Sequence, residues 1–436
     1  MEEVLKKAIE ILKNTPLCDR CLGRLFSTYG RGLSNRSRGN ALKVFLTMNV
    51  KHVVNELSED EIKDFAKNIK FKPFLETLEN LGLKLLISEE PKCFLCEDKL
   101  DYIIEKYSKE ILKNTVNYEF SNFLVGVHAP KHLLRKEEEI TRKFKIESYE
   151  SIKNEIKREV GKVVKEVTGK PPEFLEPDIL FEIDLVNDRL RIYPKPLFIY
   201  GKYVKAGRRI SQVKWLIWKE GKYEKKYKLS IEESIKPIIH VFKGKEAVLH
   251  AAGREDVDVR MLGIGRPMII EIKEPMLRKA SSERLRSVEE LVNNYSGGLV
   301  KVFLKGEVQK ENVREIKEKS KKHYKIYRAL IYSDENISEK EVQALEGFFK
   351  DKIVNQRTPL RVLHRRPDVL RKKKVFSVKT RYICEKVFEA LIKCEGGLYV
   401  KELVSGDSGR TNPSFSSVLK KSIECIELDV LYVSEK

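Results

Sequence analysis

Two Cys-x-x-Cys motifs near the amino terminus constrain the fold of this chain most: Cys18 with Cys21, and Cys93 with Cys96. Four cysteine thiolates can bind one zinc ion tetrahedrally in a closed structural site. The motifs lie about seventy residues apart, farther than in a zinc ribbon, so a small subdomain must fold between them. A redox role for either pair is the alternative, although neither pair lies in a thioredoxin-like context. The sequence therefore predicts a zinc-binding subdomain over residues 1–99, with these four cysteines as the metal ligands.

The remaining cysteines and the hydropathy indicate a cytoplasmic protein. The chain has seven cysteines in 436 residues, and an odd number argues against a secreted disulfide framework. No apolar run approaches the roughly 18 residues that cross a membrane. The start of the chain is acidic and amphipathic, unlike a signal peptide. We therefore expect a cytoplasmic location and no membrane partner.

The charge balance indicates a polyanionic partner. The chain has 86 basic and 66 acidic residues, which give a formal net charge of +20. Such a surface attracts nucleic acid. Heavy use of lysine and glutamate is also typical of thermophiles, so charge alone does not establish nucleic-acid binding.

Residues 100–220 show a mixed α/β pattern. Apolar residues from Ile152 to Val167 recur at helical spacing, and Asn187-Asp188 forms a turn signal between two alternating segments. A further strand at about 194–203 is followed by a basic run. This module is similar in placement to the THUMP domain, an RNA-binding part of several tRNA-modifying enzymes, although a pure scaffolding role stays open. Residues 221–436 are predicted to be rich in strands, with helices at about 280–294, 338–349, 384–394 and 414–421.

The most informative segment is 251–267, which reads Ala-Ala-Gly-Arg-Glu-Asp-Val-Asp-Val-Arg-Met-Leu-Gly-Ile-Gly-Arg-Pro. The alternation from Val257 onward predicts a strand, with Asp256 and Asp258 on one face of it. A carboxylate held beside arginines suits a nucleophile or a base near phosphate. A solvated charge cluster at the end of a strand is the alternative interpretation.

This segment resembles the signature of the archaeal and eukaryotic tRNA pseudouridine synthase family that acts on uridines 54 and 55. The match covers residues 253–263 and Gly265-Arg266-Pro267, and residues 18–26 also resemble the opening of that family. The resemblance places the catalytic carboxylate on Asp256, with Asp258 as the rival. Met268 stands where the family usually has an aromatic residue.

Two more segments match the same family. Residues 325–330 resemble its Lys-x-Tyr-x-Ala element, which places the active-site tyrosine on Tyr327; a core tyrosine is the alternative. Residues 396–403 resemble its Gly-Thr-Tyr-Ile-Lys/Arg strand, which implies that Lys401 pairs with the catalytic aspartate. Leu398 replaces the usual threonine, and Leu428 matches the last pocket residue of the family.

Two basic loops, 356–367 and 406–413, also resemble the family and suit phosphate contact, although a solvated face is the alternative. A catalytic role for His364, a lone histidine among these arginines, is not favoured. Together with the segments above, these loops give the following expected substrate-binding residues: Arg254, Arg260, Arg266, Arg361, Arg365, Arg366, Tyr399, Val400, Arg410 and Leu428.

The chain lacks a phosphate-binding loop of the Walker type, and Gly263-Ile264-Gly265 lacks the third glycine of a dinucleotide fingerprint. We therefore expect structural zinc and no redox or nucleotide cofactor. The resemblance implies an α+β protein: a zinc-binding and THUMP-like region, then a catalytic domain over 221–436 on a mixed, mostly antiparallel sheet. It also implies tRNA as the partner, with no obligatory protein partner. The alternatives are a non-catalytic tRNA-binding protein or RNA chaperone, and a different tRNA-modifying enzyme with a THUMP domain.

Overall fold

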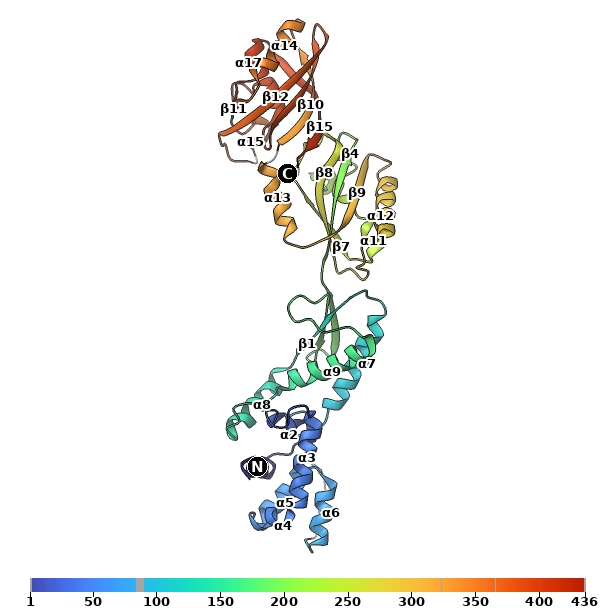
Figure 1. Ribbon diagram of the computed structural model, residues 1–436, viewed down its shortest axis with the longest axis vertical. Coiled ribbons are helices and arrows are strands. Elements are labelled where there is room, and N and C mark those ends of the chain that lie inside the picture. Colours follow the sequence, from blue (N-terminus) through green and yellow to red (C-terminus); the bar gives the residue numbers. More distant parts are fainter. Residues whose placement is uncertain (1, 84–89, 323, 365, 435–436) are drawn as a thin grey trace. The chain divides into compact units, whose positions relative to one another are not determined.

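The computed structural model describes residues 2–83, 90–322, 324–364 and 366–434. The chain divides into two compact units, residues 1–195 and 196–436, and each has its own hydrophobic core (Figure 1). No helix among the described residues is long and apolar enough to cross a membrane.

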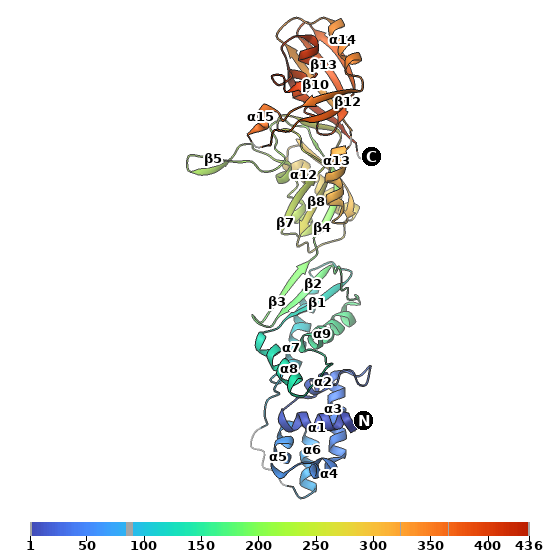
Figure 2. The ribbon, with the colours of Figure 1, turned by 90° about the vertical axis from the view of Figure 1, so that its left-hand side faces the viewer.

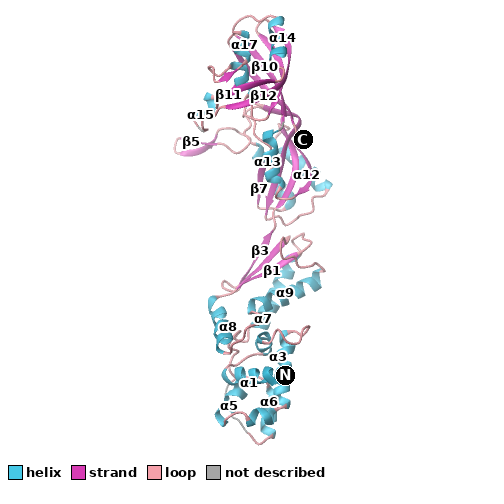
Figure 3. Cartoon of the chain, turned by 60° about the vertical axis from the view of Figure 1, so that its left-hand side comes forward, coloured by secondary structure: helices cyan, strands magenta, loops and turns pink. Residues whose placement is uncertain are grey.

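The first unit is mainly helical, with a small sheet (Figure 3). Its sheet has the order β1-β2-β3, with β1 parallel to β2 and β2 antiparallel to β3. Its elements are α1 (Glu2–Asn14), α2 (Asp19–Leu25), α3 (Asn35–Met48), α4 (Val50–Asn55), α5 (Glu59–Asn68), α6 (Lys72–Asn80), α7 (Leu100–Thr115), β1 (Phe123–His128), α8 (Lys131–Lys143), α9 (Ile152–Thr168), β2 (Ile179–Asp184) and β3 (Arg189–Pro194).

Local signals explain the clearest elements of this unit. Helix α9 begins after Ser151, whose hydroxyl accepts a hydrogen bond from the Asn154 amide, and ends at the left-handed Gly169. Its buried stripe contains Ile152, Ile156, Val160 and Val164 of the predicted helix, whereas Val167 near its end is exposed. The predicted hairpin at Asn187-Asp188 is confirmed as β2–β3, and Asp188 has the positive φ that such a turn requires.

The second unit is built on a ten-stranded sheet with the order β14-β11-β12-β13-β10-β15-β8-β4-β9, to which β7 adds beside β8. Its elements are β4 (Leu197–Lys205), β5 (Leu216–Lys219), β6 (Lys222–Lys225), α10 (Ile231–Ser234), α11 (Ile238–Phe242), β7 (Glu246–Ala251), β8 (Arg260–Lys273), α12 (Ser282–Tyr295), β9 (Val300–Val308), α13 (Asn312–Lys322), β10 (Tyr324–Ser333), α14 (Glu339–Phe348), β11 (Lys352–Gln356), α15 (Leu360–Leu363), β12 (Arg371–Cys384), β13 (Val387–Glu395), α16 (Val400–Ser405), β14 (Thr411–Asn412), α17 (Phe415–Leu419) and β15 (Ile423–Val433).

The predicted mixed, mostly antiparallel sheet is confirmed. Within this large sheet β15 and β8 pair in parallel, and the other registers are antiparallel. Helices α11 and α12 pack beside β7, β8 and β9, while α14 and α16 pack against β12 and β15 (Figure 1). The parallel β15–β8 pair places Asp429 opposite Arg260. The segment before β8 therefore lies where the strands from β14 to β15 meet the strands from β8 to β9 in the sheet order.

Four sequence predictions need correction. The second unit begins at Pro196 rather than at residue 221, because β4 pairs with both β8 and β9. The predicted helix at 384–394 is the end of β12 followed by β13. Residues 254–259 form a loop before β8 instead of a strand. The segment that contains Val400 and Lys401 forms helix α16, and the left-handed Gly406 ends it.

Candidate active site and metal centre

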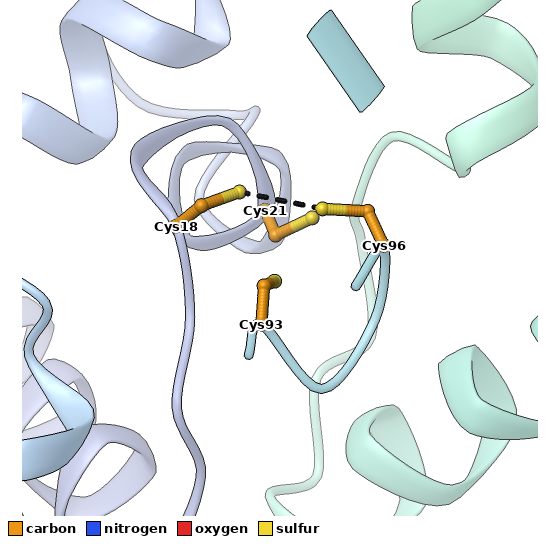
Figure 4. A group of neighbouring side chains, drawn as sticks. All are labelled: Cys18, Cys21, Cys93 and Cys96. Atoms are coloured by element: carbon orange, nitrogen blue, oxygen red, sulfur yellow. Dashed lines mark hydrogen bonds between the residues drawn. The ribbon is translucent and has the colours of Figure 1, made fainter. Parts of the chain in front are cut away.

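The four cysteines predicted as metal ligands lie together in the first unit (Figure 4). Their sulfur atoms all lie within 4.8 Å of one another, and Cys18 Sγ is 3.6 Å from Cys96 Sγ. Cys18 and Cys21 come from the start of α2, and Cys93 and Cys96 come from the turn before α7. The Phe94 amide donates a 2.8 Å hydrogen bond to the Pro16 carbonyl, which ties the two motifs together.

The arrangement of these sulfurs fits a zinc ion. Zinc–sulfur bonds of about 2.3 Å in a tetrahedron separate the sulfurs by roughly 3.8 Å, close to the Cys18–Cys96 distance. The neighbouring thiols first, and then burial, raise the pKa of Cys21, and the buried Arg24 guanidinium 3.5 Å from its Sγ opposes this rise. The cluster can therefore hold one metal ion by four thiolates.

The candidate active site lies on the loop over residues 252–259, which we call the catalytic loop. Side chains from elsewhere bind its backbone carbonyls. Lys205 Nζ donates to the Asp256 carbonyl at 3.1 Å, and Arg208 Nη1 donates to the Asp258 carbonyl at 2.7 Å. Two further bonds, from Arg266 Nη1 to Ala252 at 2.8 Å and from Gln212 Nε2 to Gly253 at 3.0 Å, hold the start of the loop. Two backbone hydrogen bonds, from the Arg209 amide to the Val257 carbonyl and from the Ala252 amide to the Pro267 carbonyl, hold the loop together with these side chains.

Glu255 forms the buried centre of these contacts. Its carboxylate accepts hydrogen bonds from Arg266 Nε at 2.8 Å and from the Tyr203 hydroxyl at 2.9 Å, and Lys205 Nζ lies 3.7 Å away. Burial alone would raise the pKa of Glu255, but Arg266 and Lys205 outweigh burial and hold this pKa below its usual value. Glu255 is therefore a buried carboxylate that holds two buried cations beneath the loop.

Asp256 is half-exposed and pairs with Arg361 of α15. The carboxylate oxygen Oδ2 lies 2.8 Å from Arg361 Nη1, and 40% of the Asp256 side chain is exposed. Arg361 Nε also donates to Oε1 of Glu402 at 2.6 Å, and Oε2 of this buried Glu402 has no hydrogen-bond partner among the described residues. Arg361 therefore bridges an accessible carboxylate and a buried one.

Lys401 pairs with Asp258 instead of Asp256. Its ammonium forms an ion pair with Asp258 Oδ2. Partial burial would raise the pKa of Asp258, but the Lys401 contact outweighs burial and lowers it. The predicted contact between Lys401 and Asp256 is absent, because Arg361 occupies that position.

Tyr327 of β10 faces the same region. Burial first, and then nearby negative groups that include Asp256, raise the pKa of Tyr327, so its phenol stays neutral at neutral pH. Leu428 of β15 lies opposite Ala329 in register and is buried, as is Val400 at the start of α16. Val400 and Leu428 belong to the hydrophobic core of the second unit, and Tyr327 packs against this core.

The expected phosphate-binding arginines differ in how accessible they are. Arg254 is exposed, and no ion pair holds it within the described part of the chain. Arg366 is exposed and donates to the Tyr399 hydroxyl at 2.8 Å. Arg410 pairs with Asp368, while Arg365 lies outside the described residues.

Arg260 and Arg266 are engaged within the protein. Arg266 is 1% exposed and pairs with Glu255. Arg260 makes a two-point contact with Asp429, at 2.7 and 2.6 Å, which joins β8 to β15. Both guanidiniums act in holding the loop and the sheet, which argues against direct contact with RNA.

A basic, aromatic hairpin, β5–β6, was not predicted from the sequence. It extends away from the large sheet (Figure 2). Trp218 and Tyr223 are 64% and 69% exposed and pack edge to face, and Lys226 lies 4.7 Å from the centre of the Trp215 ring. The alternation of lysines with aromatic residues over 214–228 was a usable signal for a surface that stacks bases and contacts phosphate.

Glu255, Glu402 and Lys205 were also missed. Each is a charged residue with a partner more than forty residues away in the sequence: Tyr203 for Glu255, Arg361 for Glu402, and the Asp256 carbonyl for Lys205. No spacing rule connects such partners, so only the folded structure reveals them.

The two regions that match known families lie one in each of the two structural units. Residues 107–184 match the family described as "Pus10 THUMP domain, archaeal", and residues 198–434 match "Pus10, C-terminal". The protein named tRNA pseudouridine synthase Pus10 from Ignisphaera aggregans is 44% identical over 434 residues, which cover 99% of each chain. The chain belongs to the Pus10 family of tRNA pseudouridine synthases. The expected THUMP domain is thereby confirmed within the predicted 100–220 region.

Other Pus10 relatives give the same result. The protein of that name from Methanocaldococcus jannaschii is 39% identical over 448 residues, covering 98% of this chain and 94% of its own. Among solved structures, a Cbf5-Nop10-Gar1 complex matches 54% of this chain and 50% of its own at 15% identity, with a TM-score of 0.31.

Proposed function

We propose that this protein converts uridine 54, uridine 55 or both in the TΨC arm of tRNA to pseudouridine, with Asp256 as the catalytic carboxylate. The observation that carries this proposal is the half-exposed Asp256 carboxylate, held by Arg361 on a loop whose backbone is fixed by buried side chains. Membership of the Pus10 family supports the reaction, and the match of residues 253–263 to the family signature supports the position.

The geometry suits the steps that isomerisation of a uridine requires. The base must leave its stack, which costs a few kcal/mol and is favoured by aromatic and apolar walls. Tyr327, Val400 and Leu428 supply such walls. Arg361 holds the Asp256 carboxylate in a fixed orientation, so that it can attack the sugar or remove a proton from its C2′.

The accessory parts supply binding. The THUMP domain, the β5–β6 hairpin and the loop that contains Arg366 are the proposed tRNA contacts, and the four cysteines are proposed to hold structural zinc near the THUMP domain. Residues 1–99 are proposed to form the zinc-binding subdomain. A protein that acts on tRNA in this way is expected in the cytoplasm.

Asp258 is the second candidate for the catalytic carboxylate, because Lys401 pairs with it and the family resemblance pairs this lysine with the catalytic aspartate. Asp256 is preferred because its charge acts on Tyr327, the expected active-site tyrosine, and because the signature places the catalytic residue there.

Mapping of pseudouridine in an unmodified tRNA transcript tests the proposal and the choice of carboxylate. Asp256→Asn removes the charge and the nucleophilic oxygen but keeps the size, so pseudouridine formation should fall to background while tRNA affinity stays near that of the wild type. Asp258→Asn, the matched control, should retain turnover. An active Asp256→Asn with an inactive Asp258→Asn would transfer the role to Asp258. A wild-type protein that binds tRNA but forms no pseudouridine would favour a non-catalytic tRNA-binding protein.

A further inference from the structure

Lys325 of β10 is a buried cation that the proposed reaction does not yet use. Three lysines are buried among the described residues, and two of them have clear partners. Lys43 Nζ contacts Asp19 at 2.8 Å and donates to the Leu17 carbonyl at 2.9 Å, and Lys205 Nζ donates to carbonyls of the catalytic loop. Lys325 is 7% exposed, and its ammonium has no hydrogen-bond or ion-pair partner within the described part of the chain. Because a buried charge without a partner destabilises a fold, such a group is retained where a ligand uses it.

The ammonium lies against the start of the catalytic loop. A Cβ on Gly253 would lie 3.5 Å from Lys325 Nζ and 3.2 Å from Arg266 Nη1, and Gly253 has a φ of +87°. Any side chain at this position would be strained and would cover both cations. The glycine therefore leaves the ammonium uncovered, three residues before Asp256.

Lys325 also shares a face of β10 with Tyr327, since side chains two residues apart point to the same side of a strand. Tyr327 is the residue proposed to stack on the flipped base. A group beside it, with little exposure of its own, can be reached by a flat base that enters the site. A backbone phosphate with a sugar on each side is much less able to enter so buried a position.

We propose that Lys325 is a substrate-binding residue whose ammonium donates a hydrogen bond to a carbonyl oxygen of the flipped uracil. This assignment rests on the proposed pseudouridine synthase function. When the N1–C1′ bond breaks, its electron pair goes to the uracil, and the negative charge spreads onto O2 and O4. The ammonium stabilises this charge and keeps its proton. When C5 bonds to C1′, the C5 proton leaves and N1 gains a proton, so the reaction remains an isomerisation.

The surroundings of the ammonium set its titration. Burial first, and then the Arg266 guanidinium of β8, lower the pKa of Lys325 to about 8. Cys394 of β13 and Glu255 of the catalytic loop act in the opposite direction, and Lys373 of β12 lowers it further. The protonated form is the donor, so the kcat/KM of the free enzyme should fall as the pH rises through about 8.

Lys325→Met tests this assignment, because methionine has a similar volume without the charge. The control is Lys393→Met on β13, where Lys393 pairs in register with Ile326 and so points to the other face of the sheet. Single-turnover pseudouridine formation is measured in wild-type and variant proteins over a range of pH. The substrates are a tRNA transcript and the same transcript with 2-thiouridine or 4-thiouridine at the target position. Wild-type turnover of the plain transcript establishes the proposed function independently.

The assignment predicts that Lys325→Met loses roughly 10²-fold or more in rate, as when one donor to a developing oxyanion is removed. Its tRNA affinity and melting temperature should not fall, its alkaline decline should disappear, and Lys393→Met should match the wild type. A thio substitution should slow the wild type and leave the variant rate unchanged.

A wild-type rate for Lys325→Met would overturn the assignment. A variant that only loses tRNA affinity, with a salt dependence smaller by about one unit, would also overturn it in favour of a phosphate contact. If Lys325→Met does not fold, the wild type decides alone: an activity with no alkaline decline and no sensitivity to either thio substitution refutes the assignment.

Discussion

The buried Glu255 carboxylate provides the sharpest test of how the catalytic loop is held. It accepts hydrogen bonds from Arg266 at 2.8 Å and from Tyr203 at 2.9 Å, and Lys205 lies 3.7 Å away. Glu255→Gln keeps the size of the side chain but leaves both cations buried without an anion. Removal of one partner from a buried ion pair costs about 3–5 kcal/mol. For a unit of this size, that free energy lowers the melting temperature by roughly 6–20 °C.

The variant should also lose turnover. Arg266 and Lys205 bind the carbonyls of Ala252 and Asp256, so a shift of these cations displaces the loop that presents the Asp256 carboxylate. Differential scanning calorimetry measures the loss of stability. Hydrogen exchange of a peptide over 252–258, followed by mass spectrometry, shows whether the loop itself opens.

Glu274→Gln is the matched control, because Glu274 forms an exposed pair with Lys245 that should contribute less than about 1 kcal/mol. The pH dependence gives a second check. The pKa of Glu255 is lowered on folding, so its contribution is fully present above the ordinary value of 4.5 and is lost as the pH falls through the lowered value. A Glu255→Gln protein as stable and as active as the wild type at neutral pH would refute the role of this buried carboxylate.

Three further variants test other parts of the proposal. Cys93→Ser should lose bound zinc, measured by atomic absorption, and lower the melting temperature of the first unit, whereas the exposed Cys384→Ser should do neither. Arg365→Gln with Arg366→Gln should weaken tRNA binding and reduce its salt dependence by up to about two units, as measured by filter binding; an unchanged salt slope contradicts phosphate contact there. Trp218→Ala should weaken tRNA binding by roughly 1–3 kcal/mol without a change in melting temperature. An unchanged affinity would show that this exposed ring stacks on no base.

Local signals were sufficient for part of the fold. The Asn187-Asp188 turn and the helical spacing of apolar residues from Ile152 onward act within a few residues, so the hairpin β2–β3 and the helix α9 were predicted correctly. The cysteine spacing likewise predicted a cluster that the folded first unit assembles.

Longer-range pairing explains the misread segment at 384–394. Its alanine, leucine, glutamate and lysine residues favour a helix in isolation. In the structure Phe388, Ala390, Ile392 and Cys394 are buried at a period of two, because β13 lies between β10 and β12. Partners on both sides decide the structure here, and they are distant in the sequence.

The catalytic loop shows the same limit at the candidate site. The alternation of Val257 and Val259 favoured a strand, but the carbonyls nearby are bound by Lys205 and Arg208 rather than by a neighbouring strand. Family resemblance implied that Lys401 pairs with the catalytic aspartate, expected at Asp256, whereas in the structure Lys401 pairs with Asp258 and Arg361 pairs with Asp256. The pairing depends on where α15 and α16 lie, which a linear motif does not encode.

Arg361 and Arg366 lie in the same basic loop, and the sequence predicted phosphate contact for both, but their partners in the structure give them different roles. Arg361 lies between Asp256 and the buried Glu402, so a phosphate that binds Arg361 must compete with two carboxylates and would release Asp256 from its counterion. Arg366 donates to the Tyr399 hydroxyl and pairs with no carboxylate among the described residues, so a phosphate can bind it without disturbing either acid. Because RNA binding should leave Asp256 oriented for reaction, Arg366 is the better phosphate contact. Arg361 is better placed to position the Asp256 carboxylate. Glu402 holds the Arg361 guanidinium in place through Oε1, which has no other ion pair in the described structure.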